Sequence, residues 1–459
     1  MRLLAKKALL PHGWADDVLI ETDPQGLIVT ATPAATASSD AERVDGFVIP
    51  GMPNLHSHAF QRAMAGLTES RGNTVDSFWT WRDLMYRFAA TITADQLQAI
   101  ATHLYMEMLK AGYTSVAEFH YLHHDRGGNR CADPGEMSHR LIAAARDAGI
   151  AITLLPVLYA YGGFGAQPPM SGQARFVHSA PSFLELFGTL RASYGHAANI
   201  RVGAAFHSLR AVAPRMMTEV IAALDAVDAT APIHLHIAEQ AKEVEACLHW
   251  SGKRSVEWLL DNVAVDERWC LVHATHLDGG EAARLAASGA VAGLCPTTEA
   301  NLGDGIFPAA RYLDAAGRIG IGSDSQVTVS VIDELRLLEY GQRLTSQRRA
   351  VLATAETPSP ARRMFDAATA GGAQALGVTA GRIEAGHRAD LAVLDPDHRA
   401  LWDVDASSIL DAWVFAGDGA CIRDTMVAGR WWIRDGRHPR EGEITAACRL
   451  AQAALRSGL

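Results

Sequence analysis

The chain has little cysteine and no apolar run of membrane-spanning length. Its six cysteines are widely spaced among 459 residues and form no C-x-x-C pair, which argues against a disulfide framework or a zinc ribbon and favours a reducing cytoplasm. No run of about 18 uncharged apolar residues occurs, so no transmembrane helix is expected. Lys6 and Lys7 interrupt the apolar residues near the start, so we expect no signal peptide.

Basic residues are also outnumbered. The 41 Lys and Arg side chains face 51 Asp and Glu, for a formal net charge of −10. Nucleic acids and anionic membranes bind basic surfaces, so we expect neither as a partner. The chain does contain 19 histidines, and histidine is the commonest metal ligand and the usual acid–base residue near neutral pH. The composition therefore directs attention to metal and proton chemistry.

Short apolar runs and segments of helical spacing alternate through most of the chain. The first fifty residues are an exception. Apolar and polar residues alternate there, and Gly and Asp mark turns between the runs, which predicts short antiparallel strands. Eight near-continuous apolar runs follow, as expected for strands that are covered on both faces. Eight β–α units predict a (β/α)8 TIM-like barrel. The runs begin at Gly51, Thr114, Ala151, Arg201, Pro232, Trp269, Ala290 and Arg318.

Strand-like patterns return after about residue 377, and we expect them to pair with the N-terminal strands. The predicted domains are a small β-sandwich from residues 1–50 plus 377–440, the barrel from 51–376, and a C-terminal helix from 441–459. Two connections, 60–112 and 159–199, are too long for ordinary barrel loops and are predicted to act as lids or substrate walls. The first of them and the C-terminal helix offer contact surfaces for a homodimer.

Six of the eight predicted strands end in residues suited to metal or proton chemistry, at the face where barrel enzymes place their active sites. Such a concentration is not expected of histidines that only fill a core. The strand-end residues are His56 with His58, His120, His207, His236 with Glu239, His273, and Asp324.

A metal-binding set can be chosen from these residues. His56 and His58 alternate along one strand, so both imidazoles point to the same face and can bind one ion. With His236 and Asp324 they form a nitrogen and oxygen set that suits zinc, and that iron and manganese also accept. His234 is a rival ligand, but His236 lies nearer the strand end and is followed by Glu239.

Four motifs in order, PGMPNLHSHAF, HLHIAE, LVHATHL and IGSDS, resemble the deaminase branch of the amidohydrolase superfamily, and the resemblance covers essentially the whole chain. It implies one divalent ion, with zinc as the expected metal. It also implies that proton transfer is shared among Glu239, His273 and Asp324. The ligands it implies are His56, His58, His236 and Asp324.

Further segments, including HSHAFQRAMAGLTE and FWTWRDLMY, resemble the deiminases of that branch that act on N-formimino-L-glutamate in histidine degradation. The expected reaction releases ammonia and leaves N-formyl-L-glutamate. This substrate carries a cationic formimino group and two carboxylates, so its pocket needs a carboxylate near the metal and arginine farther out. The resemblance assigns the substrate to Gln61, Arg82, Tyr121, His207 and Arg210.

Several alternatives stay open. Arginines 62, 71 and 87 could replace Arg82, Ser330 is a weaker substrate contact, and Trp79 with Trp81 could wall the pocket. A deaminase of a purine, pyrimidine or triazine ring would use the same metal site but would not need the arginines. A non-catalytic metal-binding barrel is a third reading. Glu239 and His273 argue against it, because metal binding requires neither.

Overall fold

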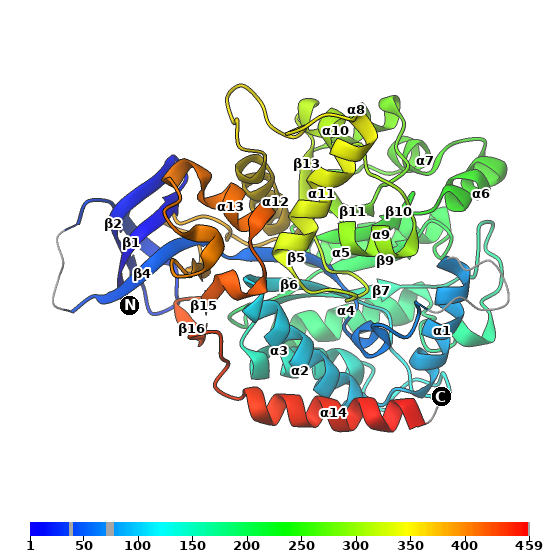
Figure 1. The fold of residues 1–459 in the computed structure, drawn as a ribbon. Coiled ribbons are helices and arrows are strands. Elements are labelled where there is room, and N and C mark those ends of the chain that lie inside the picture. Colours follow the sequence, from blue (N-terminus) through cyan, green and yellow to red (C-terminus); the bar gives the residue numbers. More distant parts are fainter. Residues whose placement is uncertain (36–39, 70–77, 458–459) are drawn as a thin grey trace.

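The computed structural model describes residues 1–35, 40–69 and 78–457, which form a barrel and a smaller sheet (Figure 1). The barrel strands are parallel and pair in chain order. A parallel bridge between Ser57 and Asp324 joins the first strand to the end of the last. The predicted (β/α)8 barrel is therefore confirmed. Its strands are β5 (Met52–Ser57), β6 (Tyr113–His120), β7 (Ala151–Leu158) with the short β8 (Ile200–Val202) beside it, β9 (Ala204–Ser208), β10 (Ile233–Ile237), β11 (Trp269–His273), β12 (Val291–Leu294) and β13 (Arg318–Ile321).

Burial explains why these strands read as apolar runs. Every residue of β6, β7, β10, β11 and β12 is buried, because side chains fill the barrel on one face and meet helices on the other. Polar groups appear where the strands end. The same geometry that removes the alternating pattern therefore gathers the chemically active residues at one end of the barrel.

Helices cover the outside of the barrel (Figure 1). The helix α2 begins with a capping box, in which the Thr93 hydroxyl accepts from the Gln96 backbone N–H and the Gln96 side chain accepts from the Thr93 N–H. The helices are α1 (Phe78–Thr91), α2 (Ala94–Lys110), α3 (Glu136–Ala148), α4 (Ala180–Tyr194), α5 (Pro214–Asp228), α6 (Ala241–Ser251), α7 (Ser255–Asn262), α8 (Gly279–Ser288), α9 (Pro296–Leu302), α10 (Ala309–Asp314), α11 (Val331–Ser346), α12 (Pro360–Leu376), α13 (Ile409–Ala416) and α14 (Glu441–Ser457).

The two long connections contain helices of their own. The first holds a 3-10 helix, η1 (Ala59–Met64), followed by α1 and α2, and the second holds η2 (Ser171–Gln173) and α4. The C-terminal helix α14 lies along α2 at the bottom of Figure 1, where Lys110 and Glu441 form an ion pair of 2.6 Å. Among the described residues, no helix has both the length and the apolar character needed to cross a membrane.

The smaller sheet combines both ends of the chain, as predicted. Its strand order is β16-β15-β14-β4-β1-β2-β3, so β4 and β14 join the N-terminal strands to the C-terminal ones. The pairing is antiparallel except between β1 and β4, which are parallel. These strands are β1 (Arg2–Leu10), β2 (Gly13–Thr22), β3 (Ile28–Thr32), β4 (Glu42–Pro50), β14 (Leu391–Leu394), β15 (Ile422–Val427) and β16 (Arg430–Ile433).

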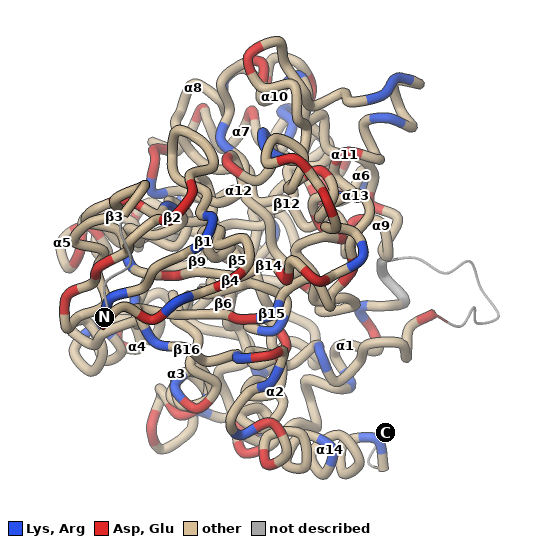
Figure 2. The backbone as a smooth tube through the Cα atoms, turned by 60° about the vertical axis from the view of Figure 1, so that its left-hand side comes forward, with Lys and Arg blue, Asp and Glu red and all other residues tan. Residues whose placement is uncertain are grey.

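Sequence alternation alone misses β1. Its register against β4 shifts between Ala5 and Lys7, and Lys6 is exposed there. The extra residue lies in β4, where two residues separate Val44 from Phe47. Strand β1 itself buries Leu3, Leu4 and Ala5 in succession, so it lacks the period of two that marks a half-buried strand. Figure 2 shows acidic and basic residues interspersed along the elements of both the sheet and the barrel.

Candidate metal and catalytic site

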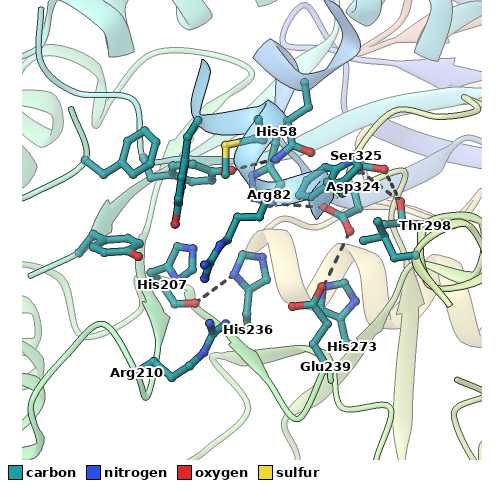
Figure 3. A pocket seen from close by; sticks show the side chains of 18 residues that line it. His58, Arg82, His207, Arg210, His236, Glu239, His273, Thr298, Asp324 and Ser325 are labelled. Carbon is teal, nitrogen blue, oxygen red and sulfur yellow. Dashed lines mark hydrogen bonds and ion pairs between the residues drawn. The ribbon is translucent and has the colours of Figure 1, made fainter. Parts of the chain in front are cut away.

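Four side chains from three strand ends converge at the carboxyl end of the barrel, and Figure 3 shows three of them. His56 and His58 lie at the end of β5, His236 lies on β10, and Asp324 follows β13. The Nε2 atom of His56 is 3.1 Å from that of His58 and 2.9 Å from that of His236. The Oδ1 atom of Asp324 is 3.5 Å from His56 Nε2 and 3.4 Å from His58 Nε2. The structure thus brings the four predicted ligands together.

The hydrogen bonds of this cluster fit a bound cation. His58 donates through Nδ1 to the Phe119 carbonyl at 2.9 Å, and His236 donates through Nδ1 to the His207 carbonyl at 3.0 Å. Each Nε2 therefore presents a lone pair toward His56. Burial lowers the pKa of all three imidazoles, that of His56 to about 3. Several lone pairs and a carboxylate in one buried place are the arrangement that a divalent ion requires.

The backbone at these strand ends adopts left-handed conformations that non-glycine residues rarely use. The φ angles are +46° at Asp324, +69° at His273 and +50° at Ala238. Such conformations persist where the surrounding structure holds them, and they concentrate at functional sites. Gly322 has a related role, because a Cβ there would lie 2.8 Å from the His56 backbone nitrogen. The last strand can therefore approach the first closely enough to place Asp324.

A buried carboxylate, Glu118 on β6, supports the first pair of ligands from behind. It accepts hydrogen bonds from the Ser57 hydroxyl at 2.6 Å, the Ala59 N–H at 2.7 Å and the Tyr105 hydroxyl at 3.1 Å. Burial raises its pKa to about 7 despite these bonds. Ser57 stands between His56 and His58, so this network fixes the backbone that presents both imidazoles. No motif or spacing pattern in the sequence predicted this role for Glu118.

Glu239 and His273 lie beside the ligand cluster (Figure 3). Nε2 of His273 is 3.9 Å from a Glu239 oxygen and 3.8 Å from Oδ2 of Asp324. Burial opposes protonation of His273, but the carboxylates of Glu239, Glu299 and Asp324 raise its pKa to about 10. Burial raises the pKa of Glu239 to about 7, against the effect of His273. The three predicted proton-transfer residues are thus within reach of one another.

Glu299 is a residue that the sequence reading missed. It lies in the first turn of α9, and its Oε1 is 3.3 Å from His273 Nδ1 while also accepting from the Cys295 N–H at 2.9 Å. A carboxylate on one ring nitrogen orients an imidazole and stabilises its protonated form. Glu299 belongs to none of the sequence motifs, so only its position after the seventh apolar run could have indicated a role at the site.

The predicted substrate residues surround a cavity above the ligand cluster. Arg82, His207 and Arg210 lie on one side of it, opposite Glu239 and Asp324 (Figure 3). Within this lining, the amide of Gln61 donates to the Tyr121 hydroxyl at 2.8 Å. The Gln61 carbonyl oxygen is buried without a protein partner. All five predicted substrate residues line this cavity: Gln61, Arg82, Tyr121, His207 and Arg210.

The cavity also has walls that the sequence reading did not single out. Thr298 and Ser325 lie beside Asp324, and their hydroxyl oxygens are 3.0 Å apart. Trp81 is one of the lining aromatic residues, as proposed for it, while the side chain of Trp79 lies outside the described ones. The further wall residues that went unnamed are Met85, Tyr86, Tyr159, Phe176 and Leu302.

The arginine and serine alternatives lie elsewhere. Arg62 forms an ion pair with Glu107 at 2.7 Å, and Arg87 is exposed on α1. Arg71 falls outside the described residues. The Ser330 hydroxyl accepts from the Asp333 N–H at the start of α11, which makes it a helix cap.

Other histidines near the strand ends are used in the frame of the barrel. His234, the rival ligand, bonds through Nε2 to the Ala375 carbonyl at 2.8 Å. His123 and His124 bond to the carbonyls of Val157 and Val177. His120 ends β6 but does not line the cavity. These residues are therefore separate from the ligand cluster.

A parallel barrel with three imidazoles and a carboxylate at its carboxyl end, beside a second carboxylate and an imidazole, defines a metal-dependent hydrolase site. The sequence profile of the amidohydrolase family matches residues 47–432. The chain belongs to this family, as the four motifs predicted.

Individual relatives narrow the comparison. A formimidoylglutamate deiminase from Pseudomonas aeruginosa is 55% identical over 439 residues, which cover 96% of each chain. The crystal structure of an amidohydrolase from Brucella melitensis is 46% identical with a TM-score of 0.93, and 99% of both chains is covered. An adenosine deaminase from Xanthomonas campestris with bound zinc is 21% identical with a TM-score of 0.82, covering 99% of this chain and 98% of that one. At that identity the likeness concerns the fold.

Proposed function

We propose that the protein hydrolyses N-formimino-L-glutamate to N-formyl-L-glutamate and ammonia, with one divalent ion, zinc being the favoured metal. The observation that carries the proposal is the distribution of charge in one cavity. Carboxylates of Glu239 and Asp324 lie at one side, and the guanidinium groups of Arg82 and Arg210 at the other. This polarity complements a substrate with a cationic formimino group at one end and two carboxylates at the other. The 55% identical deiminase from Pseudomonas aeruginosa supports the same substrate.

The ion would be held by His56, His58, His236 and Asp324. When bound, a divalent ion of this kind supplies a water that ionises near neutral pH. The nitrogen-rich ligand set favours zinc, and zinc is present in the adenosine deaminase of the same fold. Among the described residues, Asp324 is the one carboxylate grouped with His56 and His58, which supports a single ion.

The proton transfers are assigned to the three groups around that position. Asp324 directs Oδ1 toward the histidines and Oδ2 toward His273, so it can accept the proton of the attacking water while His273 steadies the attacking oxygen. Glu239, with a pKa near 7, can be protonated and can give its proton to the departing nitrogen. Water adds to the formimino carbon, the carbon–nitrogen bond to the terminal NH2 breaks, and ammonia leaves.

The remaining residues are assigned to the body of the substrate. Arg82 and Arg210 would each pair with a carboxylate through two parallel hydrogen bonds. Tyr121, whose oxygen accepts from Gln61, keeps its own hydrogen for the substrate. The unpartnered Gln61 oxygen can accept from a substrate N–H. His207 is held neutral, because burial and Arg210 lower its pKa.

The direct test is product analysis. Protein of known metal content is incubated with N-formimino-L-glutamate, and the products are identified by mass spectrometry and an ammonia assay. N-formylglutamate plus ammonia is the expected result. Glutamate plus formamide would mean that the other carbon–nitrogen bond is cleaved, and no turnover by fully loaded protein would contradict the proposal.

The competing reading is a deaminase of a purine, pyrimidine or triazine ring. Arg82→Met and Arg210→Met separate the two readings, since a flat neutral ring needs neither guanidinium. Turnover of N-formimino-L-glutamate should fall at least tenfold in each variant. Arg87→Met, on the exposed side of the same helix as Arg82, is the control and should act like the wild type. Unchanged activity in both cavity variants, or activity on guanine or adenosine, would favour the ring deaminase.

A further inference from the structure

Gln173 joins the two long connections behind two cavity-lining residues, Tyr86 and Tyr159. It ends η2 in the second connection and is fully buried. Its amide nitrogen donates to the Tyr86 hydroxyl at 3.0 Å and to the Tyr159 hydroxyl at 2.7 Å. Tyr86 lies on α1 in the first connection, and Tyr159 directly follows β7. One side chain therefore positions two phenols that come from different parts of the chain.

The direction of the hydrogen bonds in this group leaves phenol hydrogens for a ligand. The amide nitrogen of Gln173 has two hydrogens, and one goes to each phenol oxygen. Each phenol oxygen accepts in these bonds, so its own hydrogen can be donated to a further acceptor. Gln173 faces both phenols with its amide nitrogen, while its Oε1 accepts from the Met170 N–H at 2.8 Å.

The two phenols face the basic side of the cavity. Tyr86 and Tyr159 both line it together with Arg82 and Arg210. The Arg82 guanidinium lies 5.5 Å from the centre of the Tyr86 ring, and the Tyr159 ring is 4.5 Å from that of His207. A hydroxyl donor beside two guanidinium groups is suited to a carboxylate and would not favour a cation.

We propose that Tyr86 and Tyr159 form a hydroxyl subsite that donates a hydrogen bond to a substrate carboxylate, and that Gln173 is its positioning residue. This inference rests on the proposed function, because the carboxylate belongs to N-formimino-L-glutamate. The subsite resembles the Gln61–Tyr121 pair of the same cavity, where an amide also donates to a phenol. It adds a specificity element that spans both long connections.

The test measures binding separately from turnover. Tyr86→Phe, Tyr159→Phe and Gln173→Met are compared with the wild type for the Kd of N-formyl-L-glutamate by calorimetry, and for kcat and KM with N-formimino-L-glutamate. Loss of a hydrogen bond to a carboxylate should raise Kd and KM about tenfold in Tyr86→Phe or in Tyr159→Phe, and in Gln173→Met. Because neither phenol is assigned to the ion or to the proton transfers, kcat should change less than about threefold. Tyr340→Phe, on α11 outside the cavity, is the matched control.

The outcomes separate the two proposals. Normal Kd and KM in both phenylalanine variants, with an active wild type, would overturn the subsite and leave the proposed function in place. A wild type that yields no ammonia but binds N-formyl-L-glutamate more tightly than the variants would overturn the function and leave the carboxylate subsite standing. A wild type that does not bind the dicarboxylate, or a fall in kcat without a change in KM, would also overturn the subsite.

Discussion

The orientation of single side chains comes largely from backbone carbonyls. His58 and His236 each donate Nδ1–H to a carbonyl of the neighbouring strand, at Phe119 and His207. Carbonyls of a closed barrel do not move independently, so the ligands are held in place before any ion binds. Such supporting bonds are as much a part of a metal site as the ligands themselves.

Glu239 provides the sharpest test of proton transfer at the scale of one residue. Glu239→Gln keeps the shape of the side chain and removes its proton, so kcat should fall by about 10²- to 10⁴-fold. The metal content should stay the same, because Glu239 is not among the ligands. Ammonia release and elemental analysis measure the two effects. Glu245→Gln, an exposed position on the next helix, is the control, and a variant that keeps wild-type kcat would contradict the assignment.

Glu118 should affect metal affinity rather than chemistry. Glu118→Gln replaces one acceptor oxygen by an NH2 group that faces donors from Ser57, Ala59 or Tyr105. The segment between His56 and His58 should shift, and metal affinity should fall by about 10- to 100-fold. Competition with a chelator measures it. Glu339→Gln, another buried carboxylate that accepts backbone N–H bonds, should leave metal affinity unchanged.

The buried imidazole of His178 should make the stability of the protein depend on pH. It is almost fully buried, and burial together with His124 lowers its pKa to about 3, against about 6.5 in the unfolded chain. Below about pH 6.5 the unfolded chain binds a proton at this imidazole that the folded chain does not bind. The contribution of His178 to stability is therefore complete above about pH 6.5 and is lost as the pH falls toward 3. The free energy of unfolding should drop by about 2 kcal/mol from this imidazole between about pH 8 and about pH 5. Urea unfolding at both pH values should show a smaller drop in His178→Asn, and an equal drop would contradict the account.

At the scale of elements, the barrel was predictable and its supports were not. Buried strands appear in the sequence as eight apolar runs, and the histidines stand where these runs end. The strands and the ligand cluster could therefore be predicted from the sequence. Glu118 and Glu299 could not, because each acts on a residue that is distant in sequence. Strand β1 was missed because it buries successive residues and therefore does not alternate. The assigned roles of the site residues, the domain boundaries, a homodimer and a cytoplasmic location stay predictions.

The two long connections are joined by a second side chain. Arg175, just after η2, donates to the carbonyls of Ala89 and Ile92 at the end of α1, and to the His124 carbonyl. Arg82 lies on α1, so its position depends on this buried arginine. The sequence showed two long loops but nothing that joined them, since such contacts arise only when the chain has folded.

Arg175→Met should therefore loosen α1. The substitution leaves buried carbonyls without donors and should cost about 1–3 kcal/mol of stability. Hydrogen exchange across residues 78–91 should become faster, and KM should rise with a smaller change in kcat. Arg130→Met, whose guanidinium forms an exposed ion pair with Glu185, is the control. Unchanged exchange in α1 would show that other contacts hold the helix.

At the scale of the whole molecule, the protein and its proposed substrate both carry a net negative charge and therefore repel each other. The chain carries −10, and N-formimino-L-glutamate has two carboxylates and one cationic group, so both are net anionic. The acidic and basic residues are interspersed in Figure 2, whereas the arginines of the cavity act at close range. Binding must therefore depend on local pairing, because long-range attraction is absent.

This balance predicts an unusual response to salt. Salt screens the repulsion between like charges over about 8 Å at 0.15 M, while pairs buried in the cavity are screened less. The association rate should therefore rise or stay level as potassium chloride increases. Stopped-flow fluorescence with N-formyl-L-glutamate can follow it, since Trp81 lines the cavity. A steep fall in rate with salt would mean that a basic surface steers the substrate, and would contradict an attraction confined to Arg82 and Arg210.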